Sequence, residues 1–294
     1  MTKISLHIEN EYDRLEHVII GQPRGYLRDP SQFELVNEAQ KAALAAGTYP
    51  TETSLIPEFE AFAQALKARG VQVHWPEITV DSVQDQTCPR DIGFVVGDIF
   101  VICTMRPWSR KAEIEGVRHL MANWQGQIIQ APADVFLEGG DVIIAGRQIF
   151  VGIGQRSDEQ GVAFMQATFG NRYEIIPVPC QTLSAGEDVL HLDCTFNPLG
   201  LGHALIYPPG IREMPTQIEQ GYELIEVNRV EAQALATNVF SVAPDTLIAR
   251  QGALFQRLHQ KLRGWGYTVI EVQFDGVPQT GGSFRCCTLP LRRS

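Results

Sequence analysis

The sequence predicts an α/β fold in the form of a closed, five-bladed, pseudo-symmetric propeller built from ββαβ units. Two observations support this class: pairs of short strand patterns joined by a turn recur along the chain, and each pair is followed by a helical pattern and one more strand. A unit that recurs about every 40–50 residues is typical of radial or stacked repetition. No Pro/Gly/Ser tract or charge block interrupts the pattern, so we expect a single domain over residues 1–294. An ordinary mixed α/β fold is the alternative.

Four of the units lie within the chain, and hydrophobic spacing with turn residues gives their boundaries. The expected strand, strand, helix and strand are 92–96, 99–104, 109–124 and 127–130 in the first unit; 142–145, 148–153, 158–170 and 173–178 in the second; a strand near 195, then 203–207, 216–221 and 222–227 in the third; and 239–242, 246–249, 252–263 and 267–272 in the fourth. The third unit is the weakest copy.

The two ends of the chain are expected to supply the fifth unit. Its predicted strands are 17–21, 71–75 and the stretch around 285–289. Apolar residues at helical spacing predict a helix that is closed by Gly70: Phe59, Phe62, Ala63 and Leu66. An earlier helix is expected to begin at Asp29-Pro30, which offers a capping residue and a proline for the first turn, and to end near Gly47.

The composition excludes several function classes. The formal net charge is −10, which argues against a nucleic-acid binder and is compatible with a small cationic substrate. The first ten residues have no apolar core of a signal peptide, and no apolar run approaches membrane-spanning length. We therefore expect a cytoplasmic protein without a membrane partner. The six cysteines show no CxxC spacing, so we expect reduced thiols and no structural zinc site.

Four polar clusters stand where a predicted strand begins or ends. Strand ends that face one mouth of a closed sheet bring distant side chains together. The clusters are Cys88-Pro89-Arg90-Asp91, Leu137-Glu138-Gly139-Gly140-Asp141, His191-Leu192-Asp193-Cys194-Thr195-Phe196, and Thr280-Gly281-Gly282-Ser283-Phe284-Arg285-Cys286-Cys287-Thr288-Leu289-Pro290.

Together these clusters supply a thiol nucleophile, an acid/base group and several carboxylates. The thiol is Cys286 or Cys287, beside Arg285, and the acid/base group is His191. Carboxylates near a thiol raise its pKa, but a bound cation offsets them, and a planar guanidinium matches carboxylates through its forked N–H donors. Taken singly, each aspartate could be a turn residue, and the His-x-Asp pair could lie on the surface or bind a metal, although no third ligand is near in sequence.

Ordered motifs run almost from end to end: Asn10-Glu11-Tyr12-Asp13-Arg14-Leu15 with Val18-Ile19-Ile20-Gly21, Pro89-Arg90-Asp91 with Val95-Val96-Gly97, Ser109-Arg110-Lys111-Ala112-Glu113, Leu137-Glu138-Gly139-Gly140-Asp141, the segment 152–161 around Arg156, His191-Leu192-Asp193, and Gly281-Gly282 through Arg285-Cys286. With these motifs the chain resembles the guanidino-group-modifying enzymes of the pentein fold: arginine deiminase, dimethylargininase and glycine amidinotransferase.

The resemblance implies a catalytic set. Cys286 would attack the guanidinium carbon and form a covalent amidino-cysteine intermediate. His191, assisted by Glu138, would protonate the departing nitrogen and then activate water or an amine. Asp141 would either contribute to the site or fix the glycine turn before it, and Cys287 would be a packing neighbour. No metal or organic cofactor is expected, because the substrate is its own electrophile.

The resemblance also implies a binding set. Asp91 and Asp193 would hold the guanidinium N–H groups. Arg156 would bind a carboxylate of the substrate, with Arg110 or Arg106 as helpers. The expected partner is therefore a small, arginine-like guanidino compound, and a homodimer is expected only from the base rate among soluble enzymes.

The motifs divide between two reaction classes. Glu138-Gly139-Gly140-Asp141 and the compact length resemble the hydrolases, whereas Pro89-Arg90-Asp91 and the segment 235–239 are closer to the amidinotransferases. The prediction is a hydrolase of arginine or an N-substituted arginine, with amidino transfer as the alternative. A non-catalytic arginine-binding relative is a further alternative, and a redox protein built on Cys286 and Cys287 is a weaker one.

Overall fold

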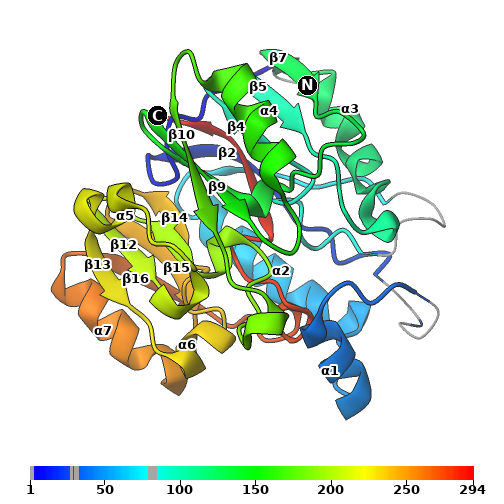
Figure 1. The fold of residues 1–294 in the computed structure, drawn as a ribbon. Helices are drawn as coiled ribbons and strands as arrows, with labels where there is room; N and C mark the ends of the chain where they lie inside the picture. Colours follow the sequence, from blue (N-terminus) through cyan, green and yellow to red (C-terminus); the bar gives the residue numbers. More distant parts are fainter. Residues whose placement is uncertain (1–2, 27–28, 30–32, 79–84) are drawn as a thin grey trace.

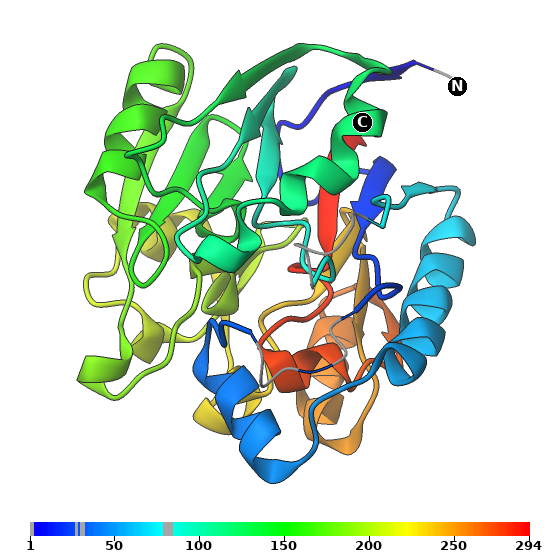
Figure 2. The same ribbon diagram turned by 90° about the vertical axis from the view of Figure 1, so that its right-hand side faces the viewer.

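The strands form a ring of small sheets around the centre of the molecule. The computed structural model describes residues 3–26, 29, 33–78 and 85–294. Within these residues there are five three-stranded sheets, and in each one an antiparallel pair is extended by a parallel third strand. The predicted fold class, a pseudo-symmetric α/β propeller of ββαβ units, is confirmed (Figure 1, Figure 2).

The first four sheets follow the predicted order. They are β4 (Gly93–Val96), β5 (Ile99–Ile102) and β7 (Gln127–Gln130); β8 (Val142–Ala145), β9 (Gln148–Ile153) and β10 (Glu174–Pro179); β11 (Phe196–Pro198), β12 (His203–Ile206) and β13 (Glu223–Glu226); and β14 (Phe240–Ala243), β15 (Thr246–Arg250) and β16 (Thr268–Val272). The helices that precede the third strands of the last three of these sheets are α4 (Glu159–Phe169), α5 (Thr216–Gly221) and α7 (Gln256–Gly264).

The fifth sheet joins the two ends of the chain. β17 (Thr288–Arg293) pairs antiparallel with β2 (Leu15–Ile20), which pairs parallel with β3 (Gln72–His74). The helix directly before β3 is α2 (Glu52–Lys67), as predicted. The prediction that the chain ends complete the ring is therefore confirmed, and the ring closes beside the stretch that carries Cys286.

The predicted helix over 109–124 was wrong. The structure has two 3-10 turns, η2 (Trp108–Arg110) and η3 (Glu113–Val117), and then a short helix, α3 (Arg118–Met121). Gly116 lowers helix propensity in the middle of this stretch, and a Cβ there would lie 2.0 Å from Nε2 of Gln86. The tight turns direct the side chain of Arg110 inward, to Asp91.

The start of the N-terminal helix also differs from the prediction. α1 (Glu38–Ala46) begins at Glu38, because the side chain of Asn37 accepts a hydrogen bond from the Gln40 N–H and caps it. Pro30 of the predicted start lies outside the described residues. The end at Gly47, which has a φ of 67°, is confirmed. Three short elements were not predicted from the sequence: β1 (Ile4–Ser5), β6 (Trp124–Gln125) and α6 (Arg229–Gln233).

The stretch that carries Cys286 is anchored in the apolar core that packs against α2. Phe62 is fully buried and its ring lies 4.7 Å from that of Phe284, two residues before Cys286. Phe274 stacks on Phe284 at 4.5 Å. Packing at this density holds side chains in fixed positions, so the core of the fifth unit also fixes the loop that leads to Cys286. No helix of the described residues is long and apolar enough to cross a membrane.

We expect Phe62→Ala to lower the free energy of unfolding by about 3–5 kcal/mol, because it leaves a cavity among three aromatic rings. Denaturant unfolding measures this loss. Val230→Ala is the control, since Val230 is 59% exposed, and it should change the free energy by less than about 0.5 kcal/mol. Equal losses in the two variants would contradict the packing described above.

Candidate active site

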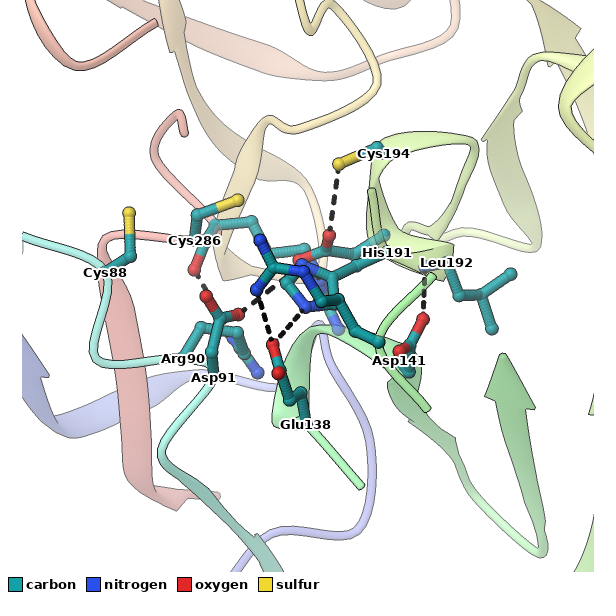
Figure 3. Close-up of polar contacts among 12 residues, drawn as sticks. Cys88, Arg90, Asp91, Glu138, Asp141, His191, Leu192, Cys194 and Cys286 are labelled. Atoms are coloured by element: carbon teal, nitrogen blue, oxygen red, sulfur yellow. Dashed lines mark hydrogen bonds and ion pairs between the residues drawn. The ribbon is translucent and has the colours of Figure 1, made fainter. Parts of the chain in front are cut away.

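Residues from separate units meet in one narrow cavity. The cavity has a volume of about 50 Å³, and its walls include five residues predicted from the sequence: Asp91, Arg110, Arg156, His191 and Cys286. Glu138, Asp141 and Asp193 do not line it but lie fully buried behind its wall. Figure 3 shows Asp91, Glu138, Asp141, His191 and Cys286 gathered from separate loops and turns next to the strands.

The structure distinguishes the two adjacent cysteines. Cys286 lines the cavity, and its carbonyl oxygen accepts a hydrogen bond of 3.1 Å from the Arg90 N–H. Cys287 points into the apolar cluster under α2, where burial raises the pKa of its thiol well above the usual value. A Cβ on Gly282 would lie 2.7 Å from Sγ of Cys88, so this position needs glycine for the stretch to pass.

His191 and Glu138 form a buried ion pair. Nε2 of His191 lies 2.8 Å from Oε2 of Glu138, and both side chains are at most 1% exposed. Burial lowers the pKa of His191, but Asp91 and Glu138 outweigh it and raise that pKa to about 10. Burial raises the pKa of Glu138, but the bond to His191 and the charge of Arg156 outweigh it and lower that pKa to about 2. The pair is therefore charged over most of the pH range.

A glycine turn lets these groups come together. η4 (Gly139–Asp141) is a single 3-10 turn, and a Cβ on Gly140 would lie 2.7 Å from the His191 ring and 2.8 Å from Oδ1 of Asp91. Asp141 is turned away from the cavity. It accepts hydrogen bonds from the Ser157 hydroxyl (2.6 Å) and the Leu192 N–H (2.8 Å). Asp141 thus holds the turn against the His-x-Asp stretch, and burial raises its pKa to about 6.

Two carboxylates flank the reactive groups. Oδ2 of Asp91 accepts from Arg110 at 2.6 Å, while its Oδ1 lies 3.7 Å from Nδ1 of His191. Oδ2 of Asp193 lies 3.3 Å from Nε of Arg285, and burial raises the pKa of Asp193 against the opposing charge of Arg285. Three of these buried atoms have no hydrogen bond within the described part of the chain: Asp91 Oδ1, His191 Nδ1 and Asp193 Oδ2. Such atoms are rare in native proteins. The two carboxylate oxygens match a ligand with N–H donors, whereas Nδ1 of the protonated His191 is itself a donor.

The arginines of the site have different partners. Arg110 donates to Asp91, to both oxygens of Glu113 and to the carbonyl of Cys88, which uses four of its five N–H groups. Arg156 donates to Oε2 of Glu138 at 3.1 Å and to the carbonyl of Val36 at 2.7 Å. The third candidate, Arg106, does not line the cavity; its side chain binds the Arg156 carbonyl and Asp158. Of the two arginines that line the cavity, Arg156 keeps more donors for a ligand.

A cluster of charged side chains lies next to Cys286, and the sequence did not predict that its members meet. Glu11 accepts from Arg285 at 2.8 Å and from Arg90 at 3.5 Å, and all three side chains are at most 4% exposed. Burial raises the pKa of Glu11, but the two arginines outweigh it and lower it to about 2. Glu11 and Arg90 stand in motifs named above, yet nothing in the sequence indicates that they meet.

Two groups in the described part of the chain bring ligand atoms within 4.8 Å of one another: Asp193, Cys194 and Cys286, and Asp91, Glu138 and His191. In the second group Nε2 of His191 is already bonded to Glu138, and Asp91 is bonded to Arg110. These groups would be the ones to hold a metal ion. The expectation that the protein needs none stays a prediction.

Comparison with known proteins identifies the family. Residues 30–293 match the family described as N,N dimethylarginine dimethylhydrolase, eukaryotic. The chain belongs to this family. An uncharacterized protein of Bacillus subtilis, YkgA, is 33% identical over 96% of this chain and 94% of its own length. The resemblance to the guanidino-modifying pentein enzymes is thereby confirmed.

Other relatives of this dimethylargininase family member carry out different reactions. Inosamine-phosphate amidinotransferase 1 of Streptomyces griseus is 25% identical over 100% of this chain and 98% of its own. Among solved structures, the N-terminal domain of ArgZ, an arginine dihydrolase from cyanobacteria with its product bound, superimposes with a TM-score of 0.80 at 21% identity, covering 96% of this chain and 98% of that domain. The surrounding superfamily therefore includes both hydrolases and amidinotransferases.

We expect Glu138→Gln to lower the pKa of His191 from about 10 by one unit or more, because the buried imidazolium loses its hydrogen-bonded anion. An NMR titration of the imidazole measures the change. Glu115→Gln is the control, since Glu115 is exposed and paired with Arg118, and it should leave the His191 pKa unchanged. An unaltered pKa in Glu138→Gln would contradict the ion pair.

The ion pair between His191 and Glu138 makes the free energy of unfolding depend on pH. The pKa of His191 is raised from 6.5, so the contribution of His191 to stability is complete below pH 6.5 and is lost as the pH rises through about 10. The pKa of Glu138 is lowered from 4.5, so its contribution is complete above pH 4.5 and is lost as the pH falls toward 2. Denaturant unfolding across this range should show both losses in the wild type, and both should be smaller in Glu138→Gln.

Proposed function

We propose that this family member hydrolyses the guanidinium group of arginine or an N-substituted arginine through a covalent adduct on Cys286. One observation carries the proposal: Asp91 lines the cavity beside Cys286 and its Oδ1 accepts no hydrogen bond from the described residues, and the buried carboxylate of Asp193 lies within 4.8 Å of the Cys286 thiol. Two buried carboxylate oxygens beside a thiol suit a cationic ligand with several N–H donors and would repel an anionic one.

Substrate binding follows from the free donors and acceptors. The guanidinium N–H groups would donate to Oδ1 of Asp91 and to Asp193. Arg156 would bind the substrate carboxylate with the donors that Glu138 and Val36 leave free. Arg110 is so fully engaged that it acts on the substrate through Asp91, whose orientation it fixes, and not by direct contact.

His191 acts as a general acid in the first half of the reaction and as a general base in the second. The Cys286 thiolate forms a bond to the guanidinium carbon, and the bond from carbon to the leaving nitrogen breaks as that nitrogen takes a proton from imidazolium. Neutral His191 then removes a proton from water, the water oxygen bonds to carbon, and the C–S bond breaks to restore the thiolate. Because Nε2 is held by Glu138, Nδ1 is the atom that transfers the proton.

Amidino transfer is the second candidate. It is supported by the full-length similarity to an amidinotransferase and requires an amine in place of water in the second half-reaction. Mass analysis after incubation with arginine, mono- and dimethylarginine, and arginine plus glycine separates the reactions. Citrulline with ammonia or a methylamine supports hydrolysis, ornithine without citrulline supports transfer, and ornithine with ammonia and carbon dioxide means a double hydrolysis. No product from any guanidine would favour the non-catalytic alternative.

We expect Cys286→Ser to lower kcat by about 10³-fold or more while substrate still binds, since the serine hydroxyl is a far weaker nucleophile at neutral pH. Cys287→Ser is the matched control and should retain kcat within a few-fold, because Cys287 faces the apolar core. Steady-state kinetics and ligand titration give both values. An inactive Cys287 variant beside an active Cys286 variant would move the nucleophile by one residue.

We expect Arg156→Ala to raise KM for arginine by about 10–100-fold, the loss of charged hydrogen bonds worth about 1.5–3 kcal/mol. Agmatine lacks the carboxylate, so its KM should change much less. This comparison separates carboxylate binding from the contact between Arg156 and Glu138, which affects both substrates alike. A wild-type preference for agmatine would contradict the assignment of Arg156.

A further inference from the structure

The short segment before β14 lies between the two catalytic stretches. Asn238 is 1% exposed, and its Oδ1 accepts hydrogen bonds from the N–H groups of Arg285 (3.0 Å) and Cys286 (3.2 Å). Its Nδ2 donates to the carbonyl of Asp193 at 3.4 Å. One side chain thus contacts the backbone of the nucleophile and the backbone of a guanidinium-binding carboxylate, which come from different units.

The segment that carries Asn238 is held by its own set of bonds. The Thr237 hydroxyl donates to the Cys194 carbonyl at 2.6 Å. Nδ2 of Asn197 donates to the carbonyls of Thr237 (2.7 Å) and Val239 (2.9 Å). Leu235, at the start of the segment, has a φ of 58°, a left-handed conformation that costs free energy for a non-glycine residue. These bonds fix the backbone of Asn238. Its side chain therefore holds the N–H groups of Arg285 and Cys286 from a fixed position.

We propose that Asn238 is a positioning residue of this active site, which sets the location of Cys286 relative to Asp193. The inference rests on the proposed function for its catalytic consequence, but the contacts themselves do not. Without the Asn238 side chain the buried N–H of Cys286 loses its acceptor, whereas that of Arg285 keeps the Asn238 carbonyl at 3.3 Å, so the backbone at Cys286 would shift to find another partner. A displacement of about 1 Å in a nucleophile lowers reactivity by roughly 10²-fold.

The same contacts bear on the class of electrophile. Enzymes that attack carbonyl groups aim backbone N–H donors at the developing oxyanion. Here the N–H groups of Arg285 and Cys286 donate to Asn238, so neither is available to a substrate oxygen. The cavity wall offers carboxylate oxygens instead. Asn238 therefore favours attack on a guanidinium, whose substituents are all N–H donors or alkylated nitrogens.

The test compares Asn238→Ala with Asn228→Ala. Each variant removes an asparagine side chain whose Oδ1 accepts from backbone N–H groups: Asn238 from Arg285 and Cys286, and Asn228 from Glu231, where it caps α6. We expect both variants to be less stable than the wild type. Only Asn238→Ala should lower kcat, by roughly 10²-fold with KM changed less than about threefold, and alter the rate of Cys286 alkylation by iodoacetamide by about tenfold or more. Equal kcat losses in both variants, or wild-type alkylation in Asn238→Ala, would overturn the proposal.

Alkylation needs no substrate, so it separates this inference from the proposed function. An altered alkylation rate in Asn238→Ala alone supports the positioning role even if no guanidine is turned over. If Asn238→Ala does not fold, Asn238→Asp replaces it, since aspartate keeps an acceptor for both N–H groups. Its carboxylate beside Cys286 should move the pH midpoint of alkylation upward, and Asn228→Asp should not. Identical midpoints in the two aspartate variants would overturn the proposal.

Discussion

The ion pair between Glu11 and Arg285 connects the two ends of the chain at the centre of the ring. Its atoms are 2.8 Å apart, both side chains are 2% exposed, and Arg285 is the neighbour of Cys286. A charge removed from water is tolerated only when its partners remain, so loss of either residue leaves an uncompensated ion in the core. The contacts that close the fifth unit therefore also fix the location of Cys286. Pairing of β17 with β2 brings Arg285 to Glu11.

Charge is arranged in two layers around Cys286. Below it, Arg90 and Arg285 share Glu11, and Arg285 also lies 3.3 Å from Asp193, so these arginines are already compensated. Above it, the cavity is faced by Asp91 and by the His191 pair. Fixed arginine charge is thus largely used within the protein, and the cavity side carries unpaired carboxylate oxygen. Under the proposed function, a bound guanidinium supplies the N–H donors and the positive charge that these carboxylate oxygens can accept.

The features of this structure that depend on residues close together in the sequence were predicted correctly. Short strand patterns, helical spacing and turn glycines predicted the five units, and the glycine pairs after Glu138 and before Cys286 marked two of the stretches that meet at the cavity. The sequence could not predict contacts such as Glu11 with Arg285, which are 274 residues apart. The helix expected over 109–124 was wrong for the same reason, since the long-range bond of Arg110 to Asp91 and the approach of Gln86 to Gly116 decide that stretch.

The size of the cavity bears on the choice between water and an amine. A volume of about 50 Å³ is enough for one or a few water molecules, since a site for one water needs only about 10–15 Å³. Arginine is itself larger than this volume, so the proposed substrate and an amine acceptor both require the wall to move. The stretch at Val36 and Asn37 forms one side of the cavity and is tied by the bonds from Arg156 to the Val36 carbonyl and from Asn37 to the Thr280 carbonyl. In the proposed hydrolysis, water would reach the adduct without a further movement of this wall, whereas amidino transfer would need the wall to admit the acceptor amine as well.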